Sequence, residues 1–135
     1  MAHVHAPGLV LRMDPDELLN HGAQCSCDED LAVRAQHFFV CIESDAKQGF
    51  WAPLFTGTAQ GTREIPHAAK SGNPRWTGSP VHYHPGQLWR ASHKAVQRAA
   101  EAARDPSTPK QPNRIAAAHV PRRDEFPAMD DVPAK

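Results

Sequence analysis

Two runs of apolar residues separated by a short polar segment dominate the hydrophobic pattern of this chain. Residues 37–42 form the first run and residues 50–56 the second, and the polar segment between them ends in Gly49. Aromatic and β-branched runs on either side of such a segment predict a β-hairpin. Both faces of the first run are mostly apolar, so we expect this strand to be covered on both sides. Pro53 cannot donate to a ladder, which predicts that the second strand is an edge strand or is bulged there.

Shorter signals before and after this hairpin predict one more strand and two helices. Residues 8–13 are apolar over the length of a strand, and Asp14 followed by a proline is typical of a helix start, with a stop at Gly22. Ser92 is a helix cap, and residues 93–104 carry a stripe of small apolar side chains at helical spacing. Small side chains in such a stripe favour close packing of the second helix against the sheet.

Glycines and prolines indicate irregular structure in the remaining segments. Residues 57–80 contain four glycines and three prolines, which predicts a long loop. Residues 81–84 and 87–90 are predicted to be a strand and its returning partner around a Pro-Gly turn. Six prolines are spread through residues 105–135, so we expect a disordered or loosely draped tail there.

These elements together predict an α+β fold. We expect a small, strongly bent antiparallel sheet or an SH3-like barrel, carrying a C-terminal helix. A chain of 135 residues has room for one domain. We assign that domain to residues 1–104, with its core in residues 37–104, and residues 105–135 to the flexible tail.

Cysteine usage and hydropathy limit the setting in which the protein works. Three cysteines, two of them close together, do not make the framework of a disulfide-stapled secreted domain. No signal peptide is evident, and no apolar stretch approaches the ~20 residues of a spanning helix. We therefore expect a cytoplasmic protein with no membrane partner.

The zero net charge of the chain hides an asymmetry. Residues 1–46 carry two basic and eight acidic side chains, whereas residues 47–114 carry ten basic and three acidic ones. This segregation indicates an anionic partner for the middle of the chain. Equally, the acidic start could fold onto the basic middle and neutralise it, and the sequence leaves both interpretations open.

Basic and aromatic residues interleave in the same middle segment, which is the composition of a surface that binds single-stranded RNA. His82 and His84 lie two apart on a predicted strand and would project from one face, suited to general base and general acid roles. Arg75 could stabilise the charge that develops on a phosphorus centre. The residues assigned to RNA binding are Arg63, Lys70, Trp76, Tyr83, Arg90 and Lys94. Alternatively, the aromatic residues belong to the core and the histidines are exposed strand residues.

The stretch from residue 37 to residue 104 resembles the PemK/MazF group of small SH3-like barrels. The resemblance rests on the hairpin, on Pro53-Leu-Phe-Thr56 at the end of its second strand, on the basic loop, on Gln87-x-Trp89 and on the helix that follows. It implies a metal-independent messenger-RNA endonuclease toxin with an antitoxin as protein partner, no cofactor, and Thr56 as a catalytic-site residue. His37-Phe38 stands where the family has Arg-Pro, so a relative that binds RNA without cleaving it is equally consistent.

Two further classes of function remain as alternatives. A non-catalytic interaction protein or inhibitor of the kind carried by mobile elements would use the acidic and basic segments as two docking faces. A zinc-stabilised binding module would bring Cys25, Cys27 and Cys41 together with His21 or His37, although the Cys-x-Cys spacing is unlike that of common structural zinc sites.

Overall fold

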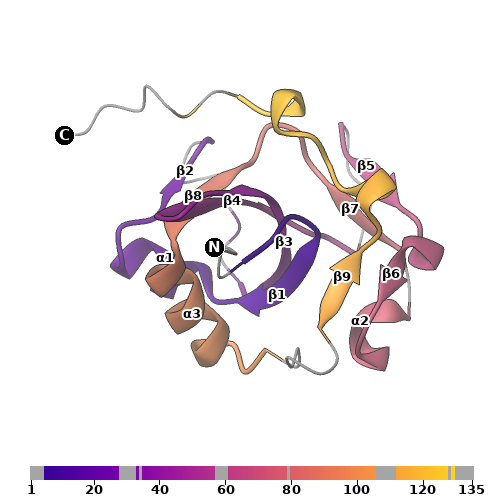
Figure 1. Cartoon of the computed structure of the whole chain (residues 1–135), viewed down its shortest axis with the longest axis horizontal. Coiled ribbons are helices and arrows are strands. Elements are labelled where there is room, and N and C mark those ends of the chain that lie inside the picture. The colour runs from indigo at the N-terminus through magenta and orange to yellow at the C-terminus, as the bar shows by residue number, and fades with distance from the viewer. Residues whose placement is uncertain are drawn as a thin grey trace.

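The computed structural model describes residues 5–27, 33, 35–56, 61–78, 80–105, 112–127 and 129, and it has the predicted α+β class. Its main sheet has the strand order β2-β8-β4-β3-β1-β9-β6, and a separate ribbon pairs β5 with β7 (Figure 1). All these pairings are antiparallel. The sheet strands are β1 (Leu9–Met13), β2 (Gln24–Cys25), β3 (His37–Ser44), β4 (Gln48–Pro53), β6 (Lys70–Ser71), β8 (Trp89–Ser92) and β9 (Asn113–Ile115), and the ribbon strands are β5 (Arg63–Ile65) and β7 (Val81–Tyr83).

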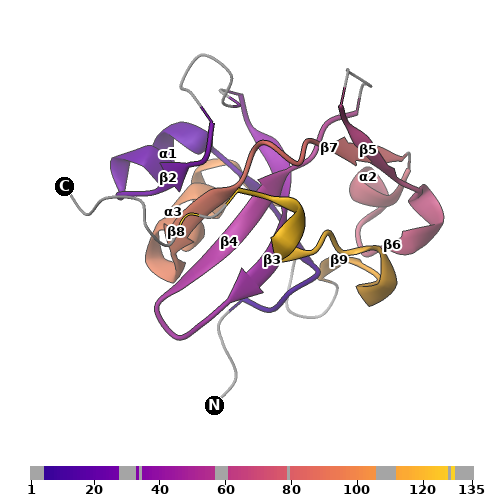
Figure 2. The same ribbon diagram turned by 90° about the horizontal axis from the view of Figure 1, so that it is seen from above.

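The sheet is not closed into a barrel, because β2 and β6 each pair with a neighbour on one side only. The helices gather at opposite ends of the molecule (Figure 2). α1 (Pro15–Asn20) and α3 (His93–Ala102) lie together at one end, and α2 (Pro74–Thr77) lies with the β5–β7 ribbon at the other. Three single turns of 3-10 helix complete the described elements: η1 (His67–Ala69), η2 (Ala117–His119) and η3 (Arg123–Glu125).

The predicted hairpin is present as β3 and β4, and it occupies the middle of the sheet. Val40 and Ile42 belong to the hydrophobic cluster on one face, and Phe39 and Cys41 belong to the cluster on the other. The prediction that this strand is covered on both sides is therefore confirmed. The prediction that the second strand is an edge strand is wrong. β4 lies between β3 and β8, but β8 pairs with it only as far as Trp51, so Pro53 pairs with Phe39 of β3 alone and interrupts no ladder on the β8 side.

Helices α1 and α3 cover one face of the sheet and begin where the sequence predicts. The Asp14 carboxylate accepts from the N–H of Asp16, and the Ser92 hydroxyl accepts from the N–H of Ala95. Ala95, Val96 and Ala99 of α3 are fully buried against the side chains of the second cluster. Because these residues are small, α3 approaches the sheet closely, as the apolar stripe indicated.

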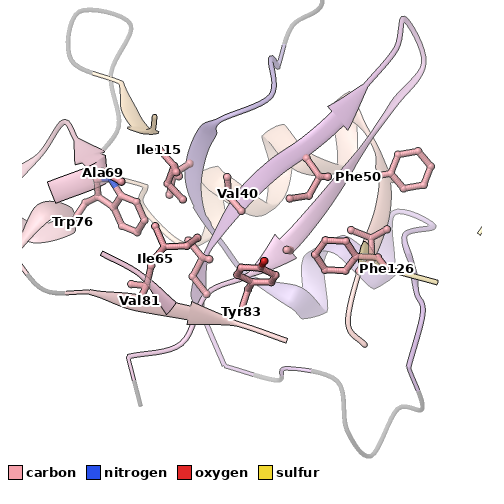
Figure 3. Packing of buried hydrophobic residues seen from close by; sticks show 14 of the residues in the cluster. Val40, Phe50, Ile65, Ala69, Trp76, Val81, Tyr83, Ile115 and Phe126 are labelled. Atoms are coloured by element: carbon pink, nitrogen blue, oxygen red, sulfur yellow. The ribbon is translucent and has the colours of Figure 1, made fainter. Parts of the chain in front are cut away.

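The opposite face carries the larger hydrophobic cluster, and the C-terminal segment contributes to it (Figure 3). Ile115, Phe126 and Met129 are each at most 6% exposed. β9 lies between β1 and β6, and the N–H of Ile115 donates to the carbonyl of Gly8 over 2.9 Å. The prediction of a flexible tail is therefore wrong for residues 112–127. Prolines flank the short elements of this segment and do not interrupt them; residues 106–111 and 130–135 lie outside the described residues.

The segment between the hairpin and α3 also differs from its prediction. Residues 61–78, expected as loop, contain β5, η1, β6 and α2. β7 and β8 do not pair with each other: β7 pairs with β5, and β8 pairs with β4 and β2. Elements of two to four residues are too short to show a hydrophobic period, so only their distant partners determine them.

Docking of the C-terminal segment depends on a close approach at Gly72. This residue has a φ of +123°, and an added Cβ would collide with Asn113 Oδ1 and lie 2.7 Å from Asn113 Cα. We expect Gly72→Ala to lower the free energy of unfolding by about 3 kcal/mol or more, measured by urea denaturation, because backbone strain and a buried clash add. Gly22→Ala is the matched control, since Gly22 also has a positive φ of +88° but nothing lies within 4 Å of its Cβ position. Gly22→Ala should lower the free energy of unfolding by only about 1 kcal/mol. If both variants lost the same free energy of unfolding, the close packing of residues 112–115 against Gly72 would not contribute to stability.

Candidate functional site

The two histidines predicted as catalytic lie on β7 and immediately after it. β7 pairs with β5 on one side, and His82 forms an isolated bridge to Phe55 on the other. Glu64 stands directly opposite His82 on β5. Since partners across a ladder share a face, Phe55, His82 and Glu64 form a row across the ribbon, while Val81 and Tyr83 face the core.

His82 is placed where its ring cannot readily exchange a proton with a substrate. Its side chain is 8% exposed, and its Nε2 lies 3.8 Å from a carboxylate oxygen of Glu64. Its Nδ1 is buried without a hydrogen-bond partner. One ring nitrogen therefore faces an acidic side chain and the other faces the interior, an arrangement that does not suit a general base.

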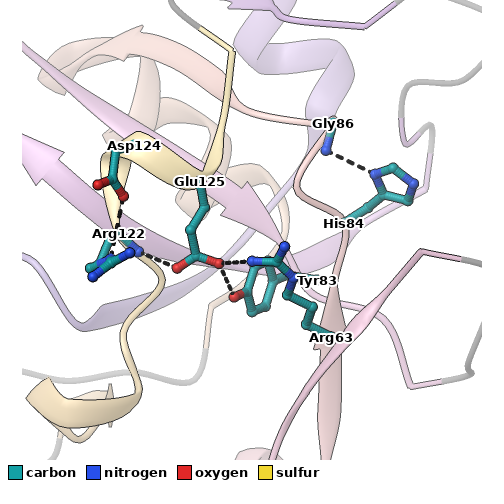
Figure 4. Close-up of polar contacts among 7 residues, drawn as sticks. All are labelled: Arg63, Tyr83, His84, Gly86, Arg122, Asp124 and Glu125. Atoms are coloured by element: carbon teal, nitrogen blue, oxygen red, sulfur yellow. Dashed lines mark hydrogen bonds and ion pairs between the residues drawn. The ribbon is translucent and has the colours of Figure 1, made fainter.

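His84 is exposed, but one of its nitrogens is already engaged. Nδ1 accepts from the N–H of Gly86 over 2.8 Å (Figure 4). In the neutral ring this bond requires the proton to be on Nε2. Protonation of Nδ1 would break the contact with Gly86. His84 is thus arranged to donate a hydrogen bond to a ligand, not to accept a proton from one.

The remaining predicted catalytic residues do not complete a reactive group. Thr56 is exposed and follows Phe55, which places it beside β7. Among the described residues, no hydrogen bond joins the Thr56 hydroxyl to His82 or His84. Arg75 belongs to α2, and its side chain lies outside the described part of the structure.

The aromatic residues assigned to RNA binding are core residues, as the alternative interpretation had it. Trp76 is 2% exposed and Tyr83 is 7% exposed. The ammonium of Lys70 lies 3.9 Å from the centre of the Trp76 ring, and burial lowers the pKa of Lys70 to about 8. These three side chains therefore stabilise the fold and offer no stacking surface to a base.

Two of the predicted arginines are bound within the protein. The guanidinium of Arg63 and the hydroxyl of Tyr83 both donate to one carboxylate oxygen of Glu125, the latter over 2.6 Å (Figure 4). The other Glu125 oxygen accepts from the N–H of Arg122 over 2.8 Å. Partial burial opposes ionisation of Glu125, but the three donors outweigh it and hold the pKa of this carboxyl below its usual value. Arg90 donates to the side chain of Gln24 and, over 3.1 Å, to the carbonyl of Met129.

Lys94 is the predicted binding residue that is exposed and has no hydrogen-bond or ion-pair partner among the described residues, and two further cations lie near it. Arg98 follows Lys94 by one helical turn on α3, so the two share a face. Lys47 lies beside the start of α3, because Gln48 pairs with Ser92. In the described part of the chain, no carboxylate lies within 4.0 Å of these three cationic groups. We call Lys47, Lys94 and Arg98 the α3 basic edge.

A pair of histidines, not predicted from the sequence, closes the end of the hairpin next to this edge. His5 Nδ1 lies 2.9 Å from His93 Nδ1, and His93 Nε2 lies 2.6 Å from the carbonyl oxygen of Asp45. Since Nε2 of His93 must donate to that carbonyl, neutral His93 accepts from His5. The His5 ring also packs edge-on against Trp51 at 5.5 Å. Burial and the proximity of His93 lower the pKa of His5 to about 4.

The cysteines do not assemble into the predicted zinc site in the described structure. Cys25 and Cys27 lie side by side, with 3.3 Å between their sulfur atoms, whereas Cys41 is fully buried in β3. No three His, Cys, Asp or Glu side chains among the described residues are arranged to hold a metal ion.

Comparison with known proteins identifies no relative: no family model, curated protein or solved structure matches the chain. The resemblance to the PemK/MazF group therefore stays a prediction. Among the described residues, no helix is both long enough and apolar enough to cross a bilayer.

The hydrogen bond at His84 determines its neutral tautomer, which can be measured. Long-range ¹⁵N–¹H spectra at pH 8 should show His84 unprotonated at Nδ1 and protonated at Nε2. His119 is an internal reference, because its side chain is exposed on a turn. In Gly86→Ala the new Cβ would lie 3.0 Å from His84 Nδ1, so the preference should weaken towards that of His119. A protonated Nδ1 in the wild-type protein would contradict the assigned role.

The lowered pKa of His5 makes the stability of the fold depend on pH. Unfolded His5 takes up a proton near its usual pKa of 6.5, whereas folded His5 does so only near 4, so stability is lost as the pH falls from about 6.5 to about 4. We expect His5→Asn to remove on the order of 1 kcal/mol of the difference in unfolding free energy between pH 7 and pH 5. Urea denaturation at the two pH values measures it, with His119→Asn as the control. If the unfolding free energy of His5→Asn depended on pH as that of the wild type does, the lowered pKa of His5 would not be the cause of that dependence.

Proposed function

We propose that this protein is a non-catalytic RNA-binding module that holds the phosphates of a single strand along the α3 basic edge. The observation that carries the proposal is that Lys47, Lys94 and Arg98 are exposed and lack ion-pair partners in the described part of the chain. Cations that are not neutralised within the protein gain most by displacing counterions from a polyanion. The high basic content of residues 47–114 supports the same class of partner.

The character of the described surface favours a polar partner over an apolar one. Leu19 is the only large hydrophobic side chain counted as exposed among the described residues, and it is 50% exposed. A single exposed leucine is ordinary on a soluble protein and does not make an apolar docking patch. This favours RNA over a protein partner, such as an antitoxin, that would require a hydrophobic interface core.

Binding without cleavage follows from the state of the two histidines. General acid–base cleavage requires one imidazole that can accept a proton and a second that can donate one to the leaving group. His82 is buried beside Glu64, and His84 Nδ1 is occupied by the N–H of Gly86. Neither ring is arranged to accept or to transfer a proton in this way, so the proposal assigns no RNA-cleaving activity to the two histidines.

Anisotropy of a short fluorescein-labelled oligouridylate, measured over a range of salt concentrations, tests the binding. Lys94→Ala and Arg98→Ala should each weaken binding about threefold to tenfold at low salt and reduce the logarithmic salt slope by about 0.7. Glu101 lies on the same side of α3, so Glu101→Gln should tighten binding. The labelled strand should remain intact on a gel throughout.

Arg122→Ala is the matched control, because Arg122 is exposed and pairs with Asp124, and Phe126 beside this turn packs on the face of the sheet opposite to α3. It should leave both affinity and salt slope unchanged. Binding that is absent, insensitive to salt, or equally weakened by Arg122→Ala would reject the α3 basic edge. Cleavage that disappears in His84→Ala would reject the non-catalytic assignment.

A further inference from the structure

Two cysteine thiols, those of Cys25 and Cys27, lie in contact in the described structure, and Cys25 packs against the face of the sheet opposite to the β5–β7 ribbon. Their sulfur atoms are 3.3 Å apart, and both side chains are partly exposed. Cys25 ends the edge strand β2 and pairs with Trp89 of β8. The residue between them, Ser26, is held by three hydrogen bonds to the segment that precedes β8.

These bonds make the proximity of the sulfur atoms a property of the fold. The Ser26 N–H donates to the carbonyl of Leu88 over 2.8 Å, its hydroxyl donates to the carbonyl of Gly86 over 2.9 Å, and the hydroxyl accepts from the N–H of Leu88 over 2.8 Å. With both sides of Ser26 bound, the flanking cysteines are kept on one side of the chain. Two thiols pre-positioned in this way react with each other far faster than two thiols free to diffuse.

We propose that Cys25 and Cys27 form a redox-active dithiol that a low-molecular-weight disulfide, such as oxidised glutathione, converts into a reversible intramolecular disulfide. This site is independent of the α3 basic edge and of RNA binding. Cys41 takes no part, because it is fully buried in β3 and hydrogen-bonded to the carbonyl of Glu43.

The chemistry proceeds as two thiol–disulfide exchanges. The Cys27 thiolate attacks one sulfur of oxidised glutathione, the glutathione disulfide breaks, and one glutathione leaves as a thiolate. Cys25 then loses its proton to the released thiolate and attacks the Cys27 sulfur, which expels the second glutathione. In sum the two protein thiols lose two electrons and two protons, and one oxidised glutathione becomes two reduced ones.

The environment of Cys25 supports this order of attack. Burial raises the pKa of Cys25 to about 12, so at neutral pH its sulfur remains a thiol. We assign Cys25 the resolving role, and the 3.3 Å between the two sulfur atoms makes its attack effective. A mixed disulfide at Cys27 would have its resolving partner already in contact.

Intact-mass spectrometry of the full chain after incubation with oxidised glutathione tests the proposal. The wild-type protein should lose two hydrogens, carry no glutathione, and retain one of its three free thiols in denaturant. Peptide mapping should place the link between Cys25 and Cys27, and reduced glutathione should reverse it. Cys25→Ser should stop at a glutathione adduct on Cys27, and Cys41→Ser should behave as the wild type does.

Ser26→Ala tests the role of Ser26 as a positioning residue while keeping both thiols. It should slow closure of the disulfide about tenfold, so that the glutathione adduct accumulates before the internal link forms. Three free thiols after prolonged incubation, a stable wild-type adduct, or a link to Cys41 would each overturn the proposal. These measurements use no RNA, so a failure of the dithiol proposal can be distinguished from a failure of the proposed RNA binding.

Discussion

The β3–β4 hairpin imposes the constraint on which the rest of this structure depends. Apolar side chains project from both of its faces, so water must be excluded on both sides. A fully buried Leu-, Phe- or Trp-sized side chain contributes about 2–3 kcal/mol relative to exposure, so neither face can be left open. α1 and α3 cover one face, and the β5–β7 ribbon, α2 and the C-terminal segment cover the other. The short elements hold together because the hairpin gives each of them a surface to pack against.

Much of this arrangement was predictable, and the parts that were not share a physical cause. The hairpin, the Asp14 cap and the helix that begins at His93 are determined by neighbours in the sequence, through alternation, capping and helical spacing. β5, β7 and β9 are three residues each and acquire their hydrogen bonds from partners many residues away. Proline counts suggested a loose C-terminal segment, because composition does not reveal that a proline stands beside an element and not inside it.

The described members of the predicted site are not brought together, for a related reason. Aromatic residues interleaved with cations are typical of RNA-binding surfaces, but the same composition is typical of a core rimmed by long polar side chains. Trp76 illustrates the ambiguity, since Lys70 lies over its ring in a buried contact that sequence alone cannot distinguish from an exposed one. Histidine spacing was equally ambiguous. The two-residue spacing predicts one shared face, yet His82 is buried on β7, whereas His84 lies after the end of the strand and is exposed.

Charge segregation along the chain also overstates the charge available at the surface, and the C-terminal segment explains why. Two of the arginines in the basic middle are bound by groups from this segment: Glu125 neutralises Arg63, and the carbonyl of Met129 accepts from Arg90. Among residues 5–27, no side chain forms an ion pair with the described part of residues 47–105. The segment that completes the larger core therefore also engages two of these cations, although Arg63 stays exposed. Lys47, Lys94 and Arg98 keep their cationic groups exposed, because α3 presents only small apolar residues to the sheet and keeps its long cationic ones outside.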